Sequence, residues 1–188
     1  MTVLTDTDIR ALGSGLISPF DPQKVQPASY DLALHPELQV PQCPGFLLDL
    51  RSMEPAGLMY CHEMSSTGFY LAPGASVLGS TIERVRCPVD CVARVEGKSS
   101  LGRIFLAVHV TAGFVDPGFD GQITLEIVNH GPWGLALWPG MAIAQINFAR
   151  TAGPCAMPYG SEGLGSHYQG QTGPTPAAGN RSASVGCE

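Results

Sequence analysis

The sequence predicts an all-β fold, a jelly roll or distorted barrel forming one domain, and three observations support this prediction. The 188 residues include 23 glycines and 16 prolines, which are poor helix formers and mark turns. Short apolar or alternating segments recur between these turn residues, as they do in sandwiches and barrels. Hydrophobic residues make up 44% of the chain and charged residues 14%, which is typical of a packed domain and not of a disordered chain.

The chain begins with the pattern of a short helix. Residues 5–8 combine a threonine suited to an N-cap with acidic residues suited to a first helical turn, and residues 9–12 are mostly apolar. Gly13 and Gly15 are expected to end this helix, because glycine readily adopts the conformation that terminates one. Prolines at 19, 22 and 27 exclude helix from the stretch that follows.

Strands are expected wherever apolar or alternating residues lie between turns. The expected strands are residues 30–34, 46–50, 68–71, 76–83, 91–95, 105–110, 121–128, 134–137 and 142–148. Turns between them are marked by the dipeptides at 73–74, 117–118, 131–132 and 139–140, each of which pairs a proline with a glycine. Their spacing of about 8–15 residues favours a sandwich, jelly roll or distorted barrel.

The composition changes after residue 153, and this change predicts how the chain is divided. Residues 1–158 are expected to form a single β domain that carries the functional site. Residues 159–176 place aromatic and amide side chains among glycines, which suits a flexible lid that closes over a ligand. Residues 177–188 are small and polar and are expected to form a disordered tail.

The charge and the N-terminal residues limit the possible partners. A net charge of −6 argues against a protein that coats nucleic acid, but a nucleotide site needs only a few well-placed cations. The chain has no apolar run long enough to cross a membrane, and the first ten residues carry two aspartates in place of a signal-peptide core. We therefore expect a soluble, cytoplasmic protein without membrane or nucleic-acid partners.

The six cysteines suggest a metal site or disulfides, but their spacing favours neither. Cys87 and Cys91 are separated by three residues, and no second pair of Cys or His residues lies at zinc-finger spacing. The signature of the zinc-dependent cytidine deaminases is also missing, since His62-Glu63 has the wrong spacing. Isolated reduced thiols and no zinc are the prediction.

Residues 96–103 carry two cations, two hydroxyls and two glycines directly after an expected strand. Such a segment can present hydroxyls, backbone N–H groups and positive charge to an oxyanion. It is not a Walker A loop, because the spacing of that motif is absent. From these residues alone, an anion site and an ordinary polar turn remain equally possible.

Residues 111–129 combine a tight turn with an amphipathic strand. The turn is expected to place Asp116 opposite the strand that carries Glu126. In that strand the apolar residues at 123, 125 and 127 share one face, so Glu126 lies with Thr124 on the other. We therefore expect Glu126 to face solvent or a cleft.

Taken together, these segments resemble the dCTP deaminases, a family within the dUTPase-like superfamily. The matching segments are residues 16–22, 25–29, 79–81, 97–103, 111–129, 138–141, 145, 159–160 and 165–176, in the family's order. The resemblance implies a dUTPase-like distorted jelly roll and homotrimers with active sites at subunit interfaces. It also implies hydrolytic deamination of dCTP without zinc.

The resemblance also implies catalytic roles for individual residues. Glu126 would take a proton from the water that attacks C4 of cytosine and later protonate the leaving ammonia. Arg103 would lie beside it, and Ser99 would orient the water and the pyrimidine edge. The backbone of Ala112 would help to hold that water.

Nucleotide binding is expected along the same segments. The residues implied for nucleotide binding in the first segment are Lys98, Ser99, Ser100, Leu101, Gly102 and Arg103, and all of them except Leu101 would line the phosphates. Gln145, Tyr159 and Gln171 would reach the triphosphate, and His167 of the lid is also implied in nucleotide binding. Asp116 would face the deoxyribose and Phe119 would stack on it. Thr124 and Leu125 would bracket the base through backbone contacts, beside Glu126.

Ala112, Gly113 and Phe114 resemble the subtype that continues from dUTP to dUMP and diphosphate, which supplies dUMP for dTMP synthesis. Gly113 is expected to leave room for a second water, and Asp116 is the candidate to activate it. Mg²⁺ bound through the nucleotide phosphates would neutralise charge without a protein metal site. Trp133 and Trp138 are expected to pack the sheet or the contact between subunits.

Four alternatives stay open at this point. The first alternative is a deaminase that stops at dUTP. A plain dUTPase is disfavoured because its position equivalent to Glu126 is normally apolar. A relative acting on another cytosine nucleotide is possible, because His167 and Thr172 stand where basic residues are common. The fourth alternative is a non-catalytic module of this fold that senses a nucleotide or binds a partner.

Overall fold

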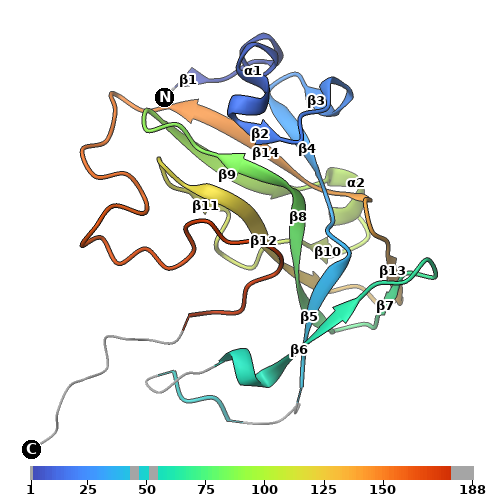
Figure 1. Ribbon diagram of the computed structural model, residues 1–188. Coiled ribbons are helices and arrows are strands. Elements are labelled where there is room, and N and C mark those ends of the chain that lie inside the picture. The colour runs from blue at the N-terminus through green and yellow to red at the C-terminus, as the bar shows by residue number, and fades with distance from the viewer. Residues whose placement is uncertain (1, 43–46, 51–54, 179–188) are drawn as a thin grey trace, which may run out of the picture.

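The computed structural model describes residues 2–42, 47–50 and 55–178, and it consists mainly of antiparallel strands (Figure 1). Two six-stranded sheets and one two-stranded sheet make up the fold. The all-β prediction is therefore confirmed. No described helix has the length and apolar character needed to cross a membrane.

The first sheet has the strand order β11-β9-β14-β4-β3, with β1 pairing on β14. Its strands are β1 (Thr2–Val3), β3 (Val25–Gln26), β4 (Ser29–Ala33), β9 (Cys91–Gly97), β11 (Phe114–Val115) and β14 (Ala142–Arg150). The central pair β9–β14 is in register from Cys91 opposite Arg150 to Gly97 opposite Ala144.

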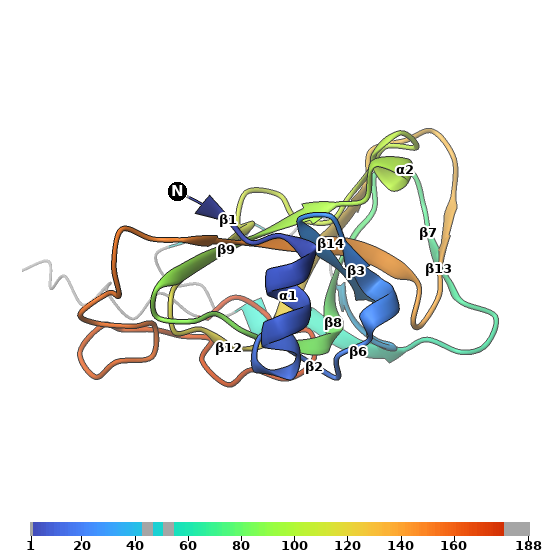
Figure 2. The same ribbon diagram turned by 90° about the horizontal axis from the view of Figure 1, so that it is seen from above.

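The second sheet has the order β10-β12-β8-β5-β6, with β2 pairing on β8. Its strands are β2 (Ile17–Ser18), β5 (Glu37–Pro41), β6 (Met59–Glu63), β8 (Ser76–Arg86), β10 (Leu106–Ala107) and β12 (Asp120–Asn129). The separate two-stranded sheet joins β7 (Phe69–Leu71) to β13 (Leu135–Leu137). In Figure 2, β9 and β14 of the first sheet lie above β8 and β12 of the second.

One hydrophobic core takes side chains from both sheets. On β12 the residues at 121, 123, 125, 127 and 129 are buried and those between them are half-buried. The fully buried Leu125 and Ile127 join Tyr30 of β4 and Phe148 of β14 in the same cluster. Alternate burial is the strand period that the sequence predicted, and it leaves the even-numbered residues of β12 for a site.

The expected N-terminal helix is present as α1 (Asp6–Leu12). The backbone N–H and the hydroxyl of Thr5 donate to Oδ2 of Asp8 at 2.9 and 2.8 Å. Gly13, with φ of +44°, ends the helix as expected. The other helical segments are short: η1 (Gly13–Gly15), η2 (Pro22–Lys24), η3 (Pro55–Leu58) and α2 (Ser99–Gly102).

Two predicted strands are wrong in whole or in part. Residues 47–50 form no strand, and Phe46 lies outside the described residues. Leu47 and Leu50 are 88% and 67% exposed, so these apolar side chains find no sheet to cover them. Within 105–110 only Leu106 and Ala107 pair with β12. Phe105 is outside the strand because it has a left-handed φ of +67°, and residues 108–110 form no strand.

Strands β5 and β6 were not predicted; they form a hairpin in which β6 is the edge strand of the second sheet. Water covers much of both strands, and their residues include glutamate, glutamine, histidine and proline. β6 lacks the apolar alternation that reveals a half-buried strand. In β5, Leu38 and Val40 do alternate with polar residues, but a pattern of two apolar residues is too short to predict a strand by itself.

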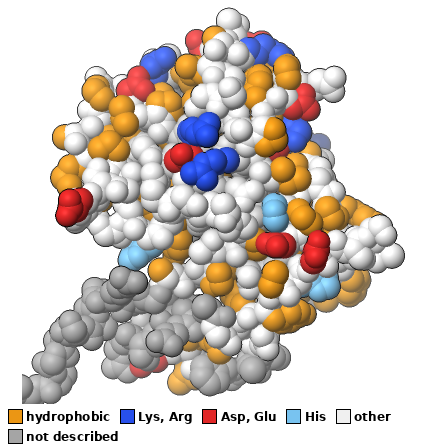
Figure 3. Space-filling view, viewed as in Figure 1, with side chains coloured by type: hydrophobic (Ala, Val, Ile, Leu, Met, Phe, Trp, Pro, Cys, Tyr) orange, Lys and Arg blue, Asp and Glu red, His pale blue; other side chains and the backbone are white. Residues whose placement is uncertain are grey.

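Charged side chains are sparse on the surface, and hydrophobic side chains reach it in several places (Figure 3). This agrees with the 14% of charged residues in the chain. Exposed aromatic residues include Tyr70, Phe105, Phe114 and Trp133. Large exposed aromatic side chains often mark surfaces that contact another molecule.

Candidate functional site

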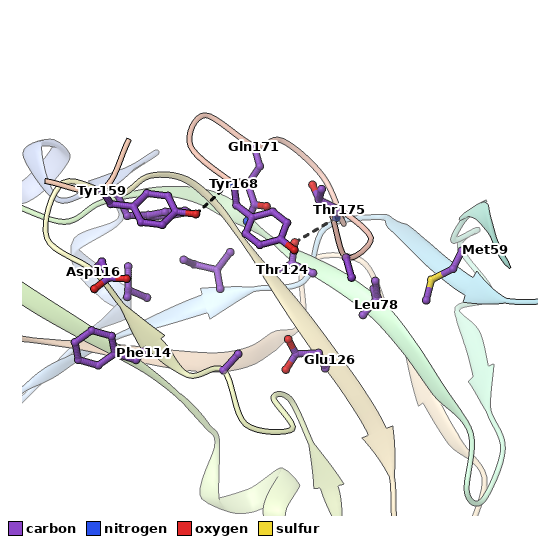
Figure 4. A pocket seen from close by; sticks show the side chains of 15 residues that line it. Met59, Leu78, Phe114, Asp116, Thr124, Glu126, Tyr159, Tyr168, Gln171 and Thr175 are labelled. Carbon is purple, nitrogen blue, oxygen red and sulfur yellow. Dashed lines mark hydrogen bonds between the residues drawn. The ribbon is translucent and has the colours of Figure 1, made fainter. Parts of the chain in front are cut away.

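A cavity of about 550 Å³ lies over β12, under the C-terminal segment (Figure 4). It is lined by Met59, Leu78, Ala112, Phe114, Val115, Asp116, Phe119, Ile123, Thr124, Glu126, Tyr159, Tyr168, Gln171, Thr175 and Ala177. Seven of these were predicted site residues: Ala112, Asp116, Phe119, Thr124, Glu126, Tyr159 and Gln171. The ionisable acids among the lining residues are Asp116 and Glu126, in otherwise mainly apolar surroundings.

Glu126 projects from β12 into this cavity, on the face opposite the buried core residues (Figure 4). Its Oε2 accepts a hydrogen bond of 2.9 Å from the backbone N–H of Val110. Val110 lies just after the short strand β10, which pairs with β12, so the segment that leads to the cavity-lining Ala112 holds the carboxylate in place. The other oxygen, Oε1, has no hydrogen bond to any residue that the structure describes.

Asp116 begins the tight turn that was expected opposite Glu126. The turn is closed by the N–H of Phe119, which donates to the carbonyl of Asp116 at 3.2 Å. Gly118 has φ of +88°, and a Cβ there would lie 2.5 Å from Cβ of Pro158, so both conformation and space require glycine. The exposed carboxylate of Asp116 makes no ion pair in the described part of the chain.

A second cavity of about 430 Å³ adjoins the first at Asp116 and Tyr159. His167, from the C-terminal segment, lines this second cavity together with Ser166 and does not line the first. Its ring lies edge-on to that of Tyr168, with centroids 6.0 Å apart. Asp116 therefore lines both cavities, the first together with Glu126 and the second together with His167.

The C-terminal segment covers the first cavity by bonding along the free edge of β12. The N–H of Gly170 donates to the carbonyl of Asp120 at 2.8 Å, and the N–H of Gln122 donates to the carbonyl of Gln171 at 3.0 Å. Farther on, the N–H of Thr175 donates to the Thr124 hydroxyl at 3.2 Å (Figure 4). In this arrangement the segment lies over β12 of its own chain.

Aromatic side chains form the end of the cavity beside Asp116. The ring of Phe119 is 7% exposed, and its centroid lies 5.7 Å from that of Tyr159. The Tyr159 hydroxyl accepts a 3.0 Å hydrogen bond from the N–H of Tyr168 (Figure 4). Phe119 and Tyr159 therefore give this end of the cavity a rigid apolar surface of the kind that a sugar ring can stack on.

The predicted phosphate-binding residues lie elsewhere. Residues 98–103 form the single turn α2 and its flanks, and none of them lines the cavity. Lys98 is paired with Asp31 of β4, with Nζ 2.5 Å from Oδ2, and Gln145 stands opposite Asp31 on β14. The side chains of Ser99, Ser100 and Arg103 are exposed. One chain therefore holds the predicted site in two separate groups.

Gly113 does not line the cavity, although both of its neighbours do. A Cβ on Gly113 would lie 2.7 Å from the carbonyl oxygen of Val95 and 3.3 Å from Nε2 of His109. Close packing against β9 is therefore a reason for glycine at this position. The role in admitting a second water stays a prediction.

Several lining residues were not predicted. Met59 and Leu78 close the end of the cavity farthest from Asp116 (Figure 4). Met59 comes from the edge hairpin that the sequence pattern did not reveal. Tyr168 was visible as an aromatic residue of the lid segment, and Phe114 as part of the subtype motif. The guanidinium of Arg94 lies 5.4 Å from the centroid of the Phe114 ring.

Cys87 supports the turn that carries Asp116. The N–H of Cys87 donates to the carbonyl of Phe119, and the N–H of Gly118 donates to the carbonyl of Cys87, both at 2.8 Å. Burial, with a smaller effect of the neighbouring Cys91 and acidic groups, raises the pKa of the Cys87 thiol to about 12. Cys43 and Cys187 lie outside the described residues. No cluster of three or more His, Cys, Asp or Glu residues in the described ranges could hold a metal ion.

Comparison with known proteins identifies the family. A model of the dCTP deaminase-like family matches residues 3–151. A protein of Beutenbergia cavernae named "dCTP deaminase, dUMP-forming" is 45% identical over 177 residues, which cover 92% of each chain. A protein of the same name from Acidothermus cellulolyticus is also 45% identical, over 93% of this chain and 94% of its own length.

Among solved structures, the 2'-deoxycytidine 5'-triphosphate deaminase from Agrobacterium tumefaciens is similar, with a TM-score of 0.65 and 25% identity. The similarity covers 80% of this chain and 48% of that protein, so the present chain spans about half its length. The sequence matches extend over nearly the whole chain, and the structural match covers most of it. This chain therefore belongs to the dCTP deaminase-like family.

Proposed function

We propose that this protein converts dCTP to dUMP in two hydrolytic steps, a deamination followed by release of diphosphate. The observation that carries the proposal is the carboxylate of Glu126, held by the Val110 N–H in a cavity that also contains Asp116. The relatives named "dCTP deaminase, dUMP-forming" support both the substrate and the product. The reaction would supply dUMP for dTMP synthesis, and we propose that it takes place in the cytoplasm.

In the first step, a water molecule attacks C4 of the cytosine ring. Glu126 accepts a proton from this water as the C4–O bond forms, and the ring becomes tetrahedral at C4. Glu126 then gives this proton to the amino group, the C4–N bond breaks and ammonia leaves, while the remaining proton of the attacking water moves from the C4 hydroxyl to N3, which gives the uracil ring of dUTP. Thr124 and Leu125 hold the base through their backbones, and the backbone of Ala112 orients the water. We propose that this step needs no zinc.

In the second step, Asp116 orients and deprotonates a water that attacks the α-phosphorus of dUTP. The bond between the α-phosphorus and its bridging oxygen breaks, giving dUMP and diphosphate. The carboxylate of Asp116, which is exposed and makes no ion pair with any described residue, also suits Mg²⁺, which prefers carboxylate and phosphate oxygens. Mg²⁺ bound through the nucleotide phosphates would neutralise their charge.

The nucleotide is proposed to lie along the cavity, with its sugar at Phe119 and Asp116 and its base at Glu126. Residues 159–176 act as the lid, and their hydrogen bonds to β12 support this role. Tyr159, His167 and Gln171 of the lid, together with Gln145, reach the triphosphate. Residues 1–158 form the single β domain beneath. The tail proposed at 177–188 falls outside the described residues from 179 onward.

The α2 group, defined as residues 98–103, is proposed to act on the cavity of a second copy of the chain. This proposal accounts for the separation of Ser99 and Arg103 from Glu126 within one chain. A homotrimer in which each copy offers its α2 group to the next would form three complete sites. Each site would then receive Glu126 and Asp116 from one copy and Ser99 and Arg103 from its neighbour.

The proposed function is tested by incubating the protein with dCTP and Mg²⁺ and resolving ammonia, dUTP, dUMP and diphosphate. We expect equal amounts of ammonia, dUMP and diphosphate. With a chelator, ammonia release should continue while dUTP replaces dUMP. Accumulation of dUTP in the presence of Mg²⁺ would indicate a deaminase alone, and no ammonia at all would refute the proposal. Comparing kcat/KM for dCTP, dCDP and dCMP tests whether His167 and Thr172 change the preferred phosphate chain.

A shared site is tested by hybrid assemblies. Glu126→Gln and Arg103→Gln chains are co-expressed with different tags, and assemblies carrying both tags are isolated. Each variant alone should be inactive, whereas a hybrid contains some sites with an intact Glu126 and an intact Arg103 from different chains. Activity recovered only in hybrids supports sharing, and its absence contradicts it.

A further inference from the structure

The cavity continues past Glu126 on the side away from Asp116, and this end of it is apolar. Leu78 and Met59 close the end, and both are half-buried (Figure 4). Leu78 of β8 stands opposite Glu126 of β12 in the strand register, and facing residues of antiparallel strands place their side chains on the same face of the sheet. The carboxylate that is proposed as the base therefore has an apolar surface beside it.

The side chains at this end offer little hydrogen bonding to a ligand. Leucine has no polar side-chain atom, and the methionine thioether is only a weak acceptor. The C-terminal segment adds the small residues Thr175 and Ala177 to the lining. The N–H of Thr175 donates to the Thr124 hydroxyl at 3.2 Å, and its own hydroxyl donates to the carbonyl of Gly173 at 3.4 Å. This end therefore suits a small apolar group better than a polar one.

The structure of cytosine determines which part of a bound nucleotide reaches the apolar end. The sugar is attached to N1, and C4 is the ring atom opposite N1, so the C4–N4 bond points away from the sugar. The proposed function puts the sugar at Phe119 and Asp116 and puts C4 at Glu126. The N4 group then points toward Leu78 and Met59, which lie farther along the cavity (Figure 4).

We propose that the same site also hydrolyses N4-alkylated deoxycytidine triphosphates, of which N4-methyl-dCTP is the simplest, and releases an alkylamine. This inference rests on the proposed function, because it uses the same base and the same orientation of the nucleotide. The N4-methyl group lies against Leu78 and Met59. Methionine can adapt to such a group, because its side chain is unbranched and flexible.

The reaction needs no reactant other than water. The water oxygen forms a bond to C4 while Glu126 takes one proton of the water. In the tetrahedral intermediate N4 has a lone pair whether or not it carries a methyl group. Glu126 gives the proton to N4, the C4–N4 bond breaks, and methylamine leaves. The second proton of the water moves from the C4 hydroxyl to N3, so the nucleotide product is dUTP, as it is from dCTP.

The apolar character of this end also sets the expected rate. One extra methylene group in an apolar pocket changes kcat/KM by about 10–200-fold, whereas a site built to hydrogen-bond a substrate group rejects an analogue without that bond by about 10⁴–10⁵-fold. Leu78 and Met59 make the first case apply to the N4 substituent. We therefore expect kcat/KM for N4-methyl-dCTP to lie within about 200-fold of the value for dCTP.

The test incubates the protein with dCTP and with N4-methyl-dCTP in separate reactions, and chromatography measures ammonia, methylamine, dUTP and dUMP. Methylamine formed at the expected rate, in an amount equal to dUTP and dUMP together, supports the inference. Ammonia from dCTP with a kcat/KM for N4-methyl-dCTP that is lower by more than about 200-fold overturns the inference and leaves the proposed function standing. Release of neither amine refutes both. Methylamine from N4-methyl-dCTP without ammonia from dCTP supports the inference and refutes dCTP as the substrate.

Variants of the apolar end test where the N4 group lies. Leu78→Phe and Met59→Phe each fill space beside Glu126, so each should lower the ratio of kcat/KM for N4-methyl-dCTP to kcat/KM for dCTP by at least about tenfold. Leu12→Phe makes the same kind of change at an exposed position of α1 and should keep the wild-type ratio. Because the ratio compares two substrates of one preparation, a misfolded fraction does not change it. A wild-type ratio in both cavity variants would show that the N4 group points elsewhere, and it would overturn the inference.

Discussion

The backbone N–H of Val110 donates a 2.9 Å hydrogen bond to Oε2 of Glu126, sixteen residues farther along the chain. This bond joins the segment after β10 to the middle of β12 and fixes one oxygen of the carboxylate. The other oxygen, Oε1, makes no hydrogen bond to a described residue, so it can accept a proton from a molecule in the cavity. This hydrogen bond does not require an ionised carboxylate at position 126, because the oxygen of an amide side chain could accept it as well.

Glu126→Gln tests the catalytic role with the geometry kept. We expect ammonia release from dCTP to fall by about 10²–10⁴-fold, because the amide accepts the Val110 N–H but cannot take a proton from water. Binding of dUTP, measured by calorimetry, should change little. Glu63→Gln on β6 is the control and should keep full activity. Ammonia release at the wild-type rate would exclude Glu126 as the base.

Asp116→Asn should separate the two proposed reactions. Because Asp116 begins the exposed turn and is not in an ion pair among the described residues, its removal should leave the fold intact. We expect ammonia release to continue while dUTP accumulates and dUMP formation falls at least about tenfold, as for the loss of a general base. Chromatography of the nucleotides measures the ratio, with Asp6→Asn in α1 as the control. An unchanged ratio of dUMP to dUTP would show that another group activates the second water.

Gly113→Ala should destabilise the fold by about 1–3 kcal/mol, as overpacking does. A Cβ there would lie 2.7 Å from the carbonyl oxygen of Val95, and backbone cannot move away easily. Scanning calorimetry should show a lower unfolding temperature. Gly153→Ala is the matched control, since nothing lies within 4 Å of its Cβ position. Equal unfolding temperatures for the two variants would contradict the packing argument.

Asp8→Ala should weaken the fold in a pH-dependent way. Hydrogen bonds from the backbone N–H and then the hydroxyl of Thr5 hold the pKa of Asp8 below its ordinary value of 3.8. A lowered pKa in the folded state means that Asp8 stabilises the fold at neutral pH and loses this effect as the pH falls through that pKa. The difference in urea midpoint between wild type and variant should therefore be largest near neutral pH and shrink below pH 3.8. A difference that grows with acidity would contradict this assignment.

Alkylation should distinguish the cysteines. Burial raises the pKa of Cys87 to about 12, so almost no thiolate forms at pH 8, while Cys61 is exposed. Iodoacetamide should label Cys61 in the native protein and leave Cys87 unmodified, as read by mass spectrometry of peptides. In urea both should react. Labelling of native Cys87 as fast as Cys61 would show that the turn behind Asp116 opens readily.

Local patterns predicted much of the fold and the centre of the site. The alternation of Ile123, Leu125 and Ile127 placed Glu126 on the open face of β12, because side chains of a strand change face at every residue. The sequence of the turn at 116–119 likewise predicted its position opposite that strand. The threonine at position 5 marked the start of α1 through a contact with Asp8, only three residues away.

Contacts between distant residues decided the rest. Lys98, which follows β9, pairs with Asp31 of β4 across the intervening strand β14. The carbonyl of Val95 leaves no room for a side chain at Gly113, and the lid bonds along β12 about fifty residues earlier in the chain. No window of neighbouring residues contains both partners of such a contact, so no periodicity could reveal it. The sequence alone determined which face of β12 carries Glu126, because strand geometry is a property of neighbouring residues. Only the tertiary structure separated the α2 group from Glu126 and left Phe105 strained at the surface, because these features depend on how whole strands pack.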